Sequence, residues 1–157
     1  GLKPGEADCV VIAGMGGELI IHILEEGRRL WDTIGYWVLS PQSELDKVRR
    51  FLEKESFSIA RETMMKEDGK YYTVMGVTRD GISWDYTSEP HYLYGGRLIR
   101  QKSPVLAEFL KKEQEQLEQI LDTLKDSDTP AALNRRGEME AMLAWNKEAQ
   151  DEMQGTD

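Results

Sequence analysis

Apolar residues follow two alternating patterns along the first half of the chain. Apolar runs at 9–13 and 36–40 are bounded by polar and glycine residues, as in strands that are buried on both faces of a parallel sheet. After each run, apolar residues recur at helical spacing, over 19–31 and over 44–55, with charged residues on the opposite face. These patterns predict a strand, a loop and a helix, repeated once, in an α/β fold.

Two further patterns, at 57–62 and 71–77, predict additional strands. Asp68-Gly69 lies between them and is a strong hairpin signal, so we expect the sheet to end in an antiparallel pair. Residues 79–102 carry few periodic apolar positions and several Gly, Pro and Tyr residues, which predict a long connection.

Helical periodicity returns after residue 102. Ser103-Pro104 and Thr129-Pro130 each combine an N-cap residue with proline at the first helical position. The apolar positions after these caps follow an approximate heptad spacing: Leu106, Leu110, Leu117, Ile120 and Leu124, then Met139, Met142, Leu143, Ala149 and Met153. The chain is therefore expected to have three parts: a sheet domain over 1–80, a connecting segment over 81–102 and a coiled-coil-like helical hairpin over 103–157.

Composition narrows the classes of protein to which the chain can belong. One cysteine among 157 residues excludes a disulfide framework and a thiolate metal cluster, and only His22 and His91 offer imidazoles, so we expect no metal site. These two histidines have no partner at catalytic spacing and are assigned no chemistry. No apolar stretch is long enough to span a membrane and no signal peptide is evident, so we expect a cytoplasmic protein without membrane contact.

The net charge of −9 argues against binding a polyanion, but the charge is unevenly distributed. Residues 1–102 carry 16 acids and 14 bases, whereas 103–157 carry 13 acids and 6 bases. A group of bases stands around the start of the predicted hairpin: Arg97, Arg100, Lys102, Lys111 and Lys112. This group could contact phosphates or could be ordinary surface charge, so the net charge does not exclude a local surface that binds nucleic acid.

The most informative local feature is Gly14-Met15-Gly16-Gly17, at the end of the first predicted strand. Glycines there let a ligand approach the backbone at the edge where open α/β sheets bind their ligands, although a tight turn would require the same residues. The loop is not a dinucleotide fingerprint, because Leu19 replaces its last glycine, and no Gly-Lys-Ser/Thr sequence follows. It is not a nucleophile elbow either, because Met15 stands in place of serine.

Further candidates lie at the same predicted rim. Gln42, after Ser40-Pro41, could read a base edge with its amide or could cap a loop. Lys70, followed by two tyrosines, could bind a phosphate while Tyr72 stacks on a base. The alternative for this second group is a solvated hairpin with one buried tyrosine.

In combination, these motifs resemble a known family. The series runs in order through Ala13-Gly14-Met15-Gly16-Gly17, Leu39-Ser40-Pro41-Gln42, Arg49-Arg50-Phe51-Leu52, Glu62 and Glu67-Asp68-Gly69-Lys70-Tyr71-Tyr72. It resembles the bacterial tRNA adenine-N1 methyltransferases that act on position 22, and the resemblance covers nearly the whole chain.

The resemblance implies a class I, Rossmann-like methyltransferase fold with S-adenosylmethionine as cofactor and tRNA as partner. It implies a pocket for the base and the methyl group made by Gly14, Met15, Gly16 and Gly17. It implies a substrate-binding rim and hairpin root made by Pro41, Gln42, Lys70, Tyr72, Arg97, Arg100 and Lys102. Catalysis would then rest on positioning, because neutral N1 of adenine already presents a lone pair to an electrophilic methyl group.

In this family the S-adenosylmethionine site lies mostly on the first half of the sheet, which has no counterpart here. The resemblance therefore implies a carboxyl-terminal portion of a methyltransferase that is inactive by itself, with 1–80 as the second half of the catalytic sheet. The strand at 9–13 would be an exposed edge through which we expect the chain to self-associate. The alternative is a noncatalytic protein-interaction module made of a half sheet and a helical hairpin.

Overall fold

The computed structural model describes residues 1–80 and 86–155, which form two compact units, Gly1–Leu98 and Ile99–Asp157. The first unit contains a four-stranded sheet made of β1 (Cys9–Met15), β2 (Tyr36–Pro41), β3 (Ser58–Glu67) and β4 (Lys70–Thr78). The strand order is β1-β2-β4-β3, with β1 and β2 parallel and both other pairings antiparallel. This topology confirms the predicted parallel strands that end in an antiparallel pair.

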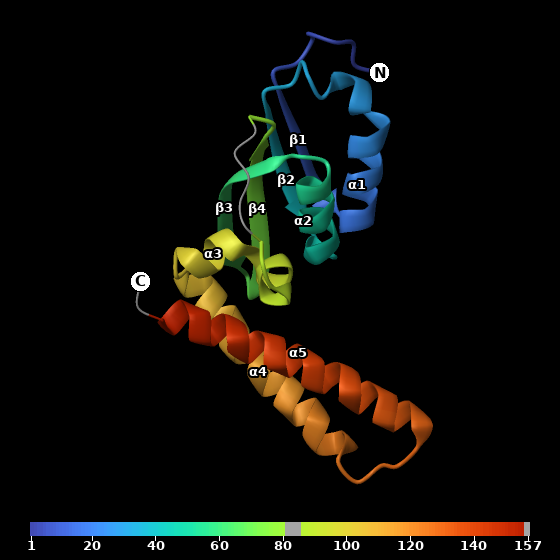
Figure 1. Cartoon of the computed structure of the whole chain (residues 1–157), viewed down its shortest axis with the longest axis vertical. Helices are drawn as coiled ribbons and strands as arrows, with labels where there is room; N and C mark the ends of the chain where they lie inside the picture. The colour runs from blue at the N-terminus through green and yellow to red at the C-terminus, as the bar shows by residue number, and fades with distance from the viewer. Residues whose placement is uncertain (81–85, 156–157) are drawn as a thin grey trace. The chain divides into compact units, whose positions relative to one another are not determined.

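Helices α1 (Gly17–Glu26) and α2 (Leu45–Lys54) lie on the same side of this sheet (Figure 1). The core forms where their apolar stripes meet one face of the strands, as Ile20 and Leu52 do against Trp37 and Leu39. A short 3-10 helix, η1 (Arg28–Leu30), brings Trp31 into the same cluster, where its ring packs edge-on against Phe57. Alternate strand residues thus point to the helices, as an α/β layer requires.

The other face of β1 is exposed, which corrects the expectation that this strand is buried on both faces. Ile12 is 6% exposed, whereas its neighbour Val11 is 67% exposed. The reason is that α1 and α2 cover only one face of the described sheet (Figure 1), and the outward side chains of β1, Cys9 and Ala13 included, face away from these helices.

The expected connection after residue 78 is partly helical. A π-helix, η2 (His91–Gly95), leads into α3 (Gly96–Arg100), and both contribute buried apolar residues, including Tyr94 and Leu98. The paired glycines Gly95 and Gly96 have low helix propensity, which is why sequence periodicity did not reveal this segment. Residues 81–85 of the expected connection lie outside the described residues.

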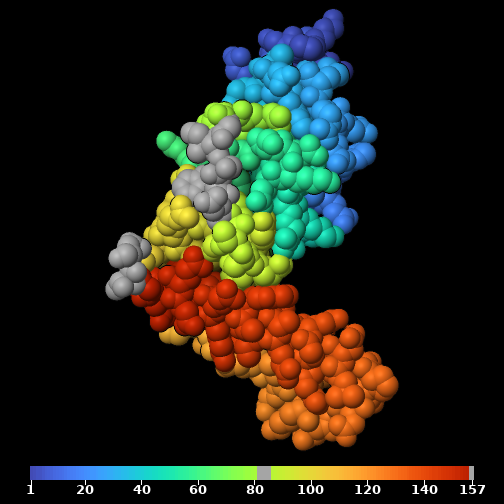
Figure 2. Space-filling model, in the orientation of Figure 1, coloured from blue at the N-terminus to red at the C-terminus, as the bar shows by residue number. Residues whose placement is uncertain are grey.

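The second unit is the predicted helical hairpin of α4 (Pro104–Leu124) and α5 (Pro130–Gln154), side by side in Figure 1. Both predicted N-caps form: Ser103 Oγ accepts from the Leu106 N–H and Thr129 Oγ1 from the Ala132 N–H, each at 3.2 Å. Figure 2 shows the surfaces of the two helices in contact. Leu106, Leu110 and Leu117 are buried, as the heptad spacing predicts.

A buried asparagine interrupts the apolar seam of the hairpin. Asn146 is fully buried, and its side-chain amide donates to the Leu110 carbonyl at 2.9 Å and to Glu113 Oε1 at 3.0 Å. Gln150 extends the network by donating to Gln114 Oε1 at 2.8 Å. Because each amide must meet its partner, this network fixes the register of α4 against α5.

Candidate functional site at the carboxyl ends of the parallel strands

The carboxyl ends of β1 and β2 are joined into one rim. Met15 pairs with Pro41 across the two strands, and the Gln42 N–H donates to the Met15 carbonyl at 2.9 Å. The Gly17 N–H donates to the Ser43 carbonyl at 3.0 Å. The structure therefore brings together the glycine loop and the Pro41-Gln42 segment, as the strand pattern predicts.

The glycines of this loop differ in what surrounds them. Gly14 has φ +77°, and a Cβ placed there would meet nothing within 4 Å, so its backbone is open to an approaching group. A Cβ on Gly17 would lie 2.6 Å from the Ser43 carbonyl oxygen, and one on Gly16 would lie 2.9 Å from Ser43 Oγ. Open access thus characterises Gly14, whereas Gly17 is required by the close packing of α1 on the loop before α2.

An ion-pair bridge links the first turns of α1 and α2. Lys47 Nζ lies 2.8 Å from Glu18 Oε1 and 2.7 Å from Glu44 Oε2. The hydrogen bond from Lys47 lowers the pKa of Glu18, and the hydrogen bonds to Glu18 and Glu44 raise the pKa of Lys47. The ammonium group of Lys47 is thus held between two side-chain carboxyl groups of the protein, one from each helix start.

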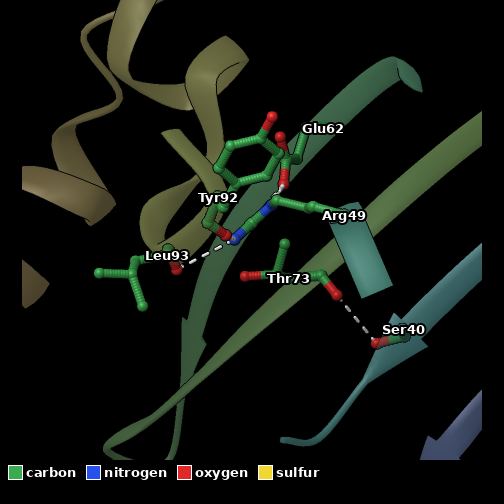
Figure 3. A network of polar contacts seen from close by, with 6 residues as sticks. All are labelled: Ser40, Arg49, Glu62, Thr73, Tyr92 and Leu93. Carbon is green, nitrogen blue, oxygen red and sulfur yellow. Dashed lines mark hydrogen bonds and ion pairs between the residues drawn. The ribbon is translucent and has the colours of Figure 1, made fainter. Parts of the chain in front are cut away.

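The β3–β4 hairpin extends past the end of β2 at this rim. The β2–β4 pairing ends at Leu39 and Met75, and Ser40 Oγ then donates to the Thr73 carbonyl at 3.1 Å (Figure 3). Because β4 runs antiparallel to β2, Lys70 and Tyr72 lie beyond this contact, at the same end of the sheet as Gly14. Both are exposed, whereas the intervening Tyr71 is half-buried.

Behind the rim, a buried ion pair joins α2 to β3. The Arg49 guanidinium donates to Glu62 Oε1 through Nε at 2.9 Å and Nη2 at 2.5 Å, and both side chains are almost fully buried. Arg49 Nη1 also donates to the carbonyls of Tyr92 and Leu93, at 2.7 and 3.0 Å, and so holds η2 (Figure 3). A Cβ on Gly95 would lie 2.9 Å from both Glu62 oxygens, so only glycine fits where η2 passes the pair.

The sequence pattern over 44–55 places charged residues on the face opposite the apolar one, so it did not predict that Arg49 is buried with Glu62. The signal was available in its spacing: Arg49 follows Leu45 by four residues and precedes Leu52 by three, so it lies on the apolar stripe of α2. Glu62 has no signal in the sequence beyond its place in the family motif.

The expected basic residues at the hairpin root do not share one environment. Arg97 belongs to the first unit and is half-buried, with its Nε shielded from solvent. Arg100 and Lys102 belong to the second unit and are exposed, and Lys102 Nζ donates to the Gly155 carbonyl at 3.0 Å near the end of α5. Lys102 therefore satisfies an orphan carbonyl at a helix end.

Residues 1–80 and 86–155 contain neither a cluster of metal-binding side chains nor a membrane-spanning helix. No three His, Cys, Asp or Glu side chains gather there as a metal site would require, and no helix is long and apolar enough to cross a bilayer. His91 is buried, and its Nδ1 accepts from the Thr87 N–H at 3.2 Å, which is a structural role.

Comparison with known proteins gives consistent matches. The family model described as TrmK, tRNA (adenine(22)-N(1))-methyltransferase, matches residues 1–148. The curated tRNA (adenine(22)-N(1))-methyltransferase of Bacillus subtilis is 36% identical over 120 residues, which cover 74% of this chain and 49% of the relative. The chain thus spans about half the length of this relative.

Solved structures agree with the sequence matches. The crystal structure of the B. subtilis m1A22 tRNA methyltransferase TrmK aligns with a TM-score of 0.75 and 31% identity, covering 94% of this chain and 65% of that one. A Streptococcus pneumoniae protein solved in complex with S-adenosyl-L-methionine aligns with a TM-score of 0.73 and 30% identity, covering 90% and 59%. With its Rossmann-like sheet, its glycine loop and a family match over 148 residues, the chain belongs to the tRNA (adenine(22)-N(1))-methyltransferase family.

Proposed function

We propose that the complete protein methylates N1 of adenine 22 in tRNA, with S-adenosylmethionine as methyl donor, and that this chain supplies the substrate side of its catalytic centre. The observation that carries the proposal is the open backbone of Gly14 at the carboxyl end of β1, next to Pro41 and Gln42. Family membership supports the reaction and the cofactor, and we place the complete protein in the cytoplasm with its tRNA substrate.

The chain's own residues contribute position rather than proton transfer. When bound, S-adenosylmethionine would supply an electrophilic sulfonium methyl group and would leave as S-adenosylhomocysteine once its sulfur–methyl bond breaks. Neutral N1 of adenine already has the in-plane lone pair that would accept this methyl group. The base must be extruded from its stack to reach that methyl group, and the open backbone at Gly14 gives it room. Pro41 and Gln42 border this space, where the Gln42 amide offers one donor and one acceptor to a base edge.

Substitution of Gly14 tests the site. In the complete protein, Gly14→Ala should lower kcat/KM for unmodified tRNA at least tenfold, because the new methyl group occupies the approach to the base. Gly5→Ala is a matched control: Gly5 also has positive φ (+86°) and open space around its Cβ, so it introduces the same backbone strain away from the rim. Equal losses in the two variants would show strain alone and contradict the assignment.

The assay itself separates the enzyme from the noncatalytic module. The product, 1-methyladenosine at position 22, is detected by mass spectrometry after nuclease digestion of the tRNA. The complete protein should form it and this chain alone should not. A folded complete protein that forms no product would overturn the enzymatic function and favour the protein-interaction module.

We also propose that this chain, produced alone, self-associates through β1. In the described sheet the outer edge of β1 has no strand partner, and Val11 exposes an apolar side chain beside it. An unpaired edge with an apolar face is a template for pairing with another copy.

A further inference from the structure

The outer part of the β3–β4 hairpin is a two-stranded ribbon. We call residues Met65–Tyr72 the hairpin tip. Its strands pair through Met65 with Tyr72, Lys66 with Tyr71 and Glu67 with Lys70, whereas the pairing of β4 with β2 has already ended at Met75. In Figure 3 the two strands continue together past Thr73. The tip is therefore supported by its own ladder and extends from the rim of the candidate site.

One face of the tip presents an exposed apolar pair. Met65 and Tyr72 are directly opposite each other across the ladder and are 43% and 37% exposed. Lys70 follows the same face, two residues from Tyr72, because side chains alternate along a strand. A thioether and a phenol side by side form a flat, polarisable surface next to an ammonium group.

The opposite face carries a second ammonium group. Lys66 Nζ lies 5.5 Å from the centroid of the Tyr71 ring, within the range of a cation–π contact. A lysine thus stands on each face of the ribbon, and each face also carries an aromatic side chain, Tyr72 with Lys70 and Tyr71 with Lys66. This combination of stacking surfaces and basic side chains is typical of surfaces that bind unpaired nucleotides.

The position of the tip connects it to the candidate site. Tyr72 directly precedes Thr73, whose carbonyl accepts from Ser40, and Ser40 directly precedes Pro41 of the rim. When the target base leaves its stack, its neighbours in the RNA lose a stacking partner, and they would lie next to this rim.

We propose that the hairpin tip binds a nucleotide next to the target adenine, with its base stacked on Met65 and Tyr72 and its phosphate near Lys70. This inference rests on the proposed function and names the part of the tRNA that the rim engages: an unpaired nucleotide, held by stacking without reading its sequence. Met65 thereby becomes a substrate-binding residue that the sequence did not reveal.

Steady-state kinetics of the complete protein test the inference. Tyr72→Ala and Met65→Ala should each raise the KM for tRNA about 5- to 100-fold, the range expected for loss of one base-stacking contact, and leave the KM for S-adenosylmethionine unchanged. Tyr72→Phe should retain the wild-type KM, because it keeps the ring. Leu133→Ala, at an apolar residue on α5 that is 48% exposed, is the matched control and should have no effect. An unchanged KM for tRNA in both tip variants, or an equal rise in Leu133→Ala, overturns the inference.

Direct binding distinguishes failure of this inference from failure of the proposed function. The affinity of this chain for an unmodified tRNA is measured by fluorescence anisotropy at several salt concentrations, with circular dichroism confirming that each variant is folded. Tyr72→Ala should weaken binding, and Lys70→Ala should reduce the slope of log Kd against log salt by about 0.7, whereas Lys125→Ala should not. If the complete protein forms no methylated product but these binding changes occur, the tip binds RNA and only the enzymatic proposal fails. If neither tip substitution changes the binding of tRNA, the inference that the hairpin tip binds a nucleotide is overturned.

Discussion

The buried contact between Arg49 and Glu62 makes two single residues unusually important for stability. Arg49→Met would leave the Glu62 carboxylate buried without its cation and the Tyr92 and Leu93 carbonyls without a donor. We expect the free energy of unfolding, measured by urea denaturation, to fall by about 3–5 kcal/mol.

A double variant and a neighbouring arginine provide the controls. Arg49→Met combined with Glu62→Met removes both charges and should be less destabilised than Arg49→Met alone, because no unpaired charge remains buried. Arg50→Ala should cost much less, since the ion pair of Arg50 with Glu89 is exposed to solvent. If Arg49→Met and Arg50→Ala lost the same free energy of unfolding, burial of the Arg49–Glu62 pair would not explain its contribution to stability.

The raised pKa of the Tyr92 phenol predicts that the folded state loses stability at alkaline pH. Burial, followed by the hydrogen bond that the hydroxyl donates to Glu53, raises the pKa of Tyr92 to about 12. Because the folded state favours the protonated phenol, this stabilisation is complete below pH 10, the ordinary pKa of tyrosine, and is lost as the pH rises towards 12. In a tyrosinate absorbance titration, Tyr92→Phe should lose one late-ionising group. An unchanged number of late-ionising groups would contradict the assignment.

At the scale of elements, α1 packs closely against the loop that precedes α2. Gly17→Ala would place its Cβ 2.6 Å from the Ser43 carbonyl and 2.8 Å from that of Glu44, so α1 must shift. We expect a loss of about 1–3 kcal/mol of unfolding free energy, typical of overpacking. The same substitution at Gly137, in α5, meets nothing within 4 Å and should stabilise the protein by about 0.5–1 kcal/mol. A loss of stability at Gly137, or none at Gly17, would contradict this reasoning.

The elements also show where a sequence pattern is informative and where it is not. The period of apolar residues predicted β1, α1, β2, α2, the antiparallel pair and the hairpin, because each of these buries one face or stripe. It predicted both faces of β1 to be buried, since an apolar run does not reveal whether a neighbouring layer covers both sides. It missed η2 and α3, where Gly95 is required by the buried carboxylate of Glu62 and not by a turn.

At the candidate site, the order of strands and loops along the chain predicted which segments lie next to each other. It did not predict which residues of those segments are open and which are packed. Parallel strands that end together must bring Gly14–Gly17 near Pro41 and Gln42, and the structure has them hydrogen-bonded. The difference between an open Gly14 and a packed Gly17 depends on Ser43 and Glu44, which approach only in the folded chain. The partnership of Met65 with Tyr72 depends on hairpin register, which the Asp68-Gly69 turn sets.

On the scale of the whole molecule, the exposed edge predicts concentration-dependent association. Sedimentation velocity of this chain over a hundredfold concentration range should show a shift from monomer to dimer. Val11→Lys should reduce that shift, because a charge on an edge strand opposes pairing. Leu133→Lys, which places the same charge on an exposed apolar position of α5, should not. A monodisperse monomer at all concentrations, or equal effects of the two substitutions, would contradict association through β1.

The hydrogen bonds between the two rim loops have a consequence for movement. Gln42 is tied to Met15 and Ser43 to Gly17, while Lys47 bridges the first turns of both helices. Neither loop can shift alone without breaking these contacts, so the two loops move together. A base that displaced the glycine loop by a fraction of an ångström would also displace Gln42, and a substrate contact on one loop would thereby change the position of the other.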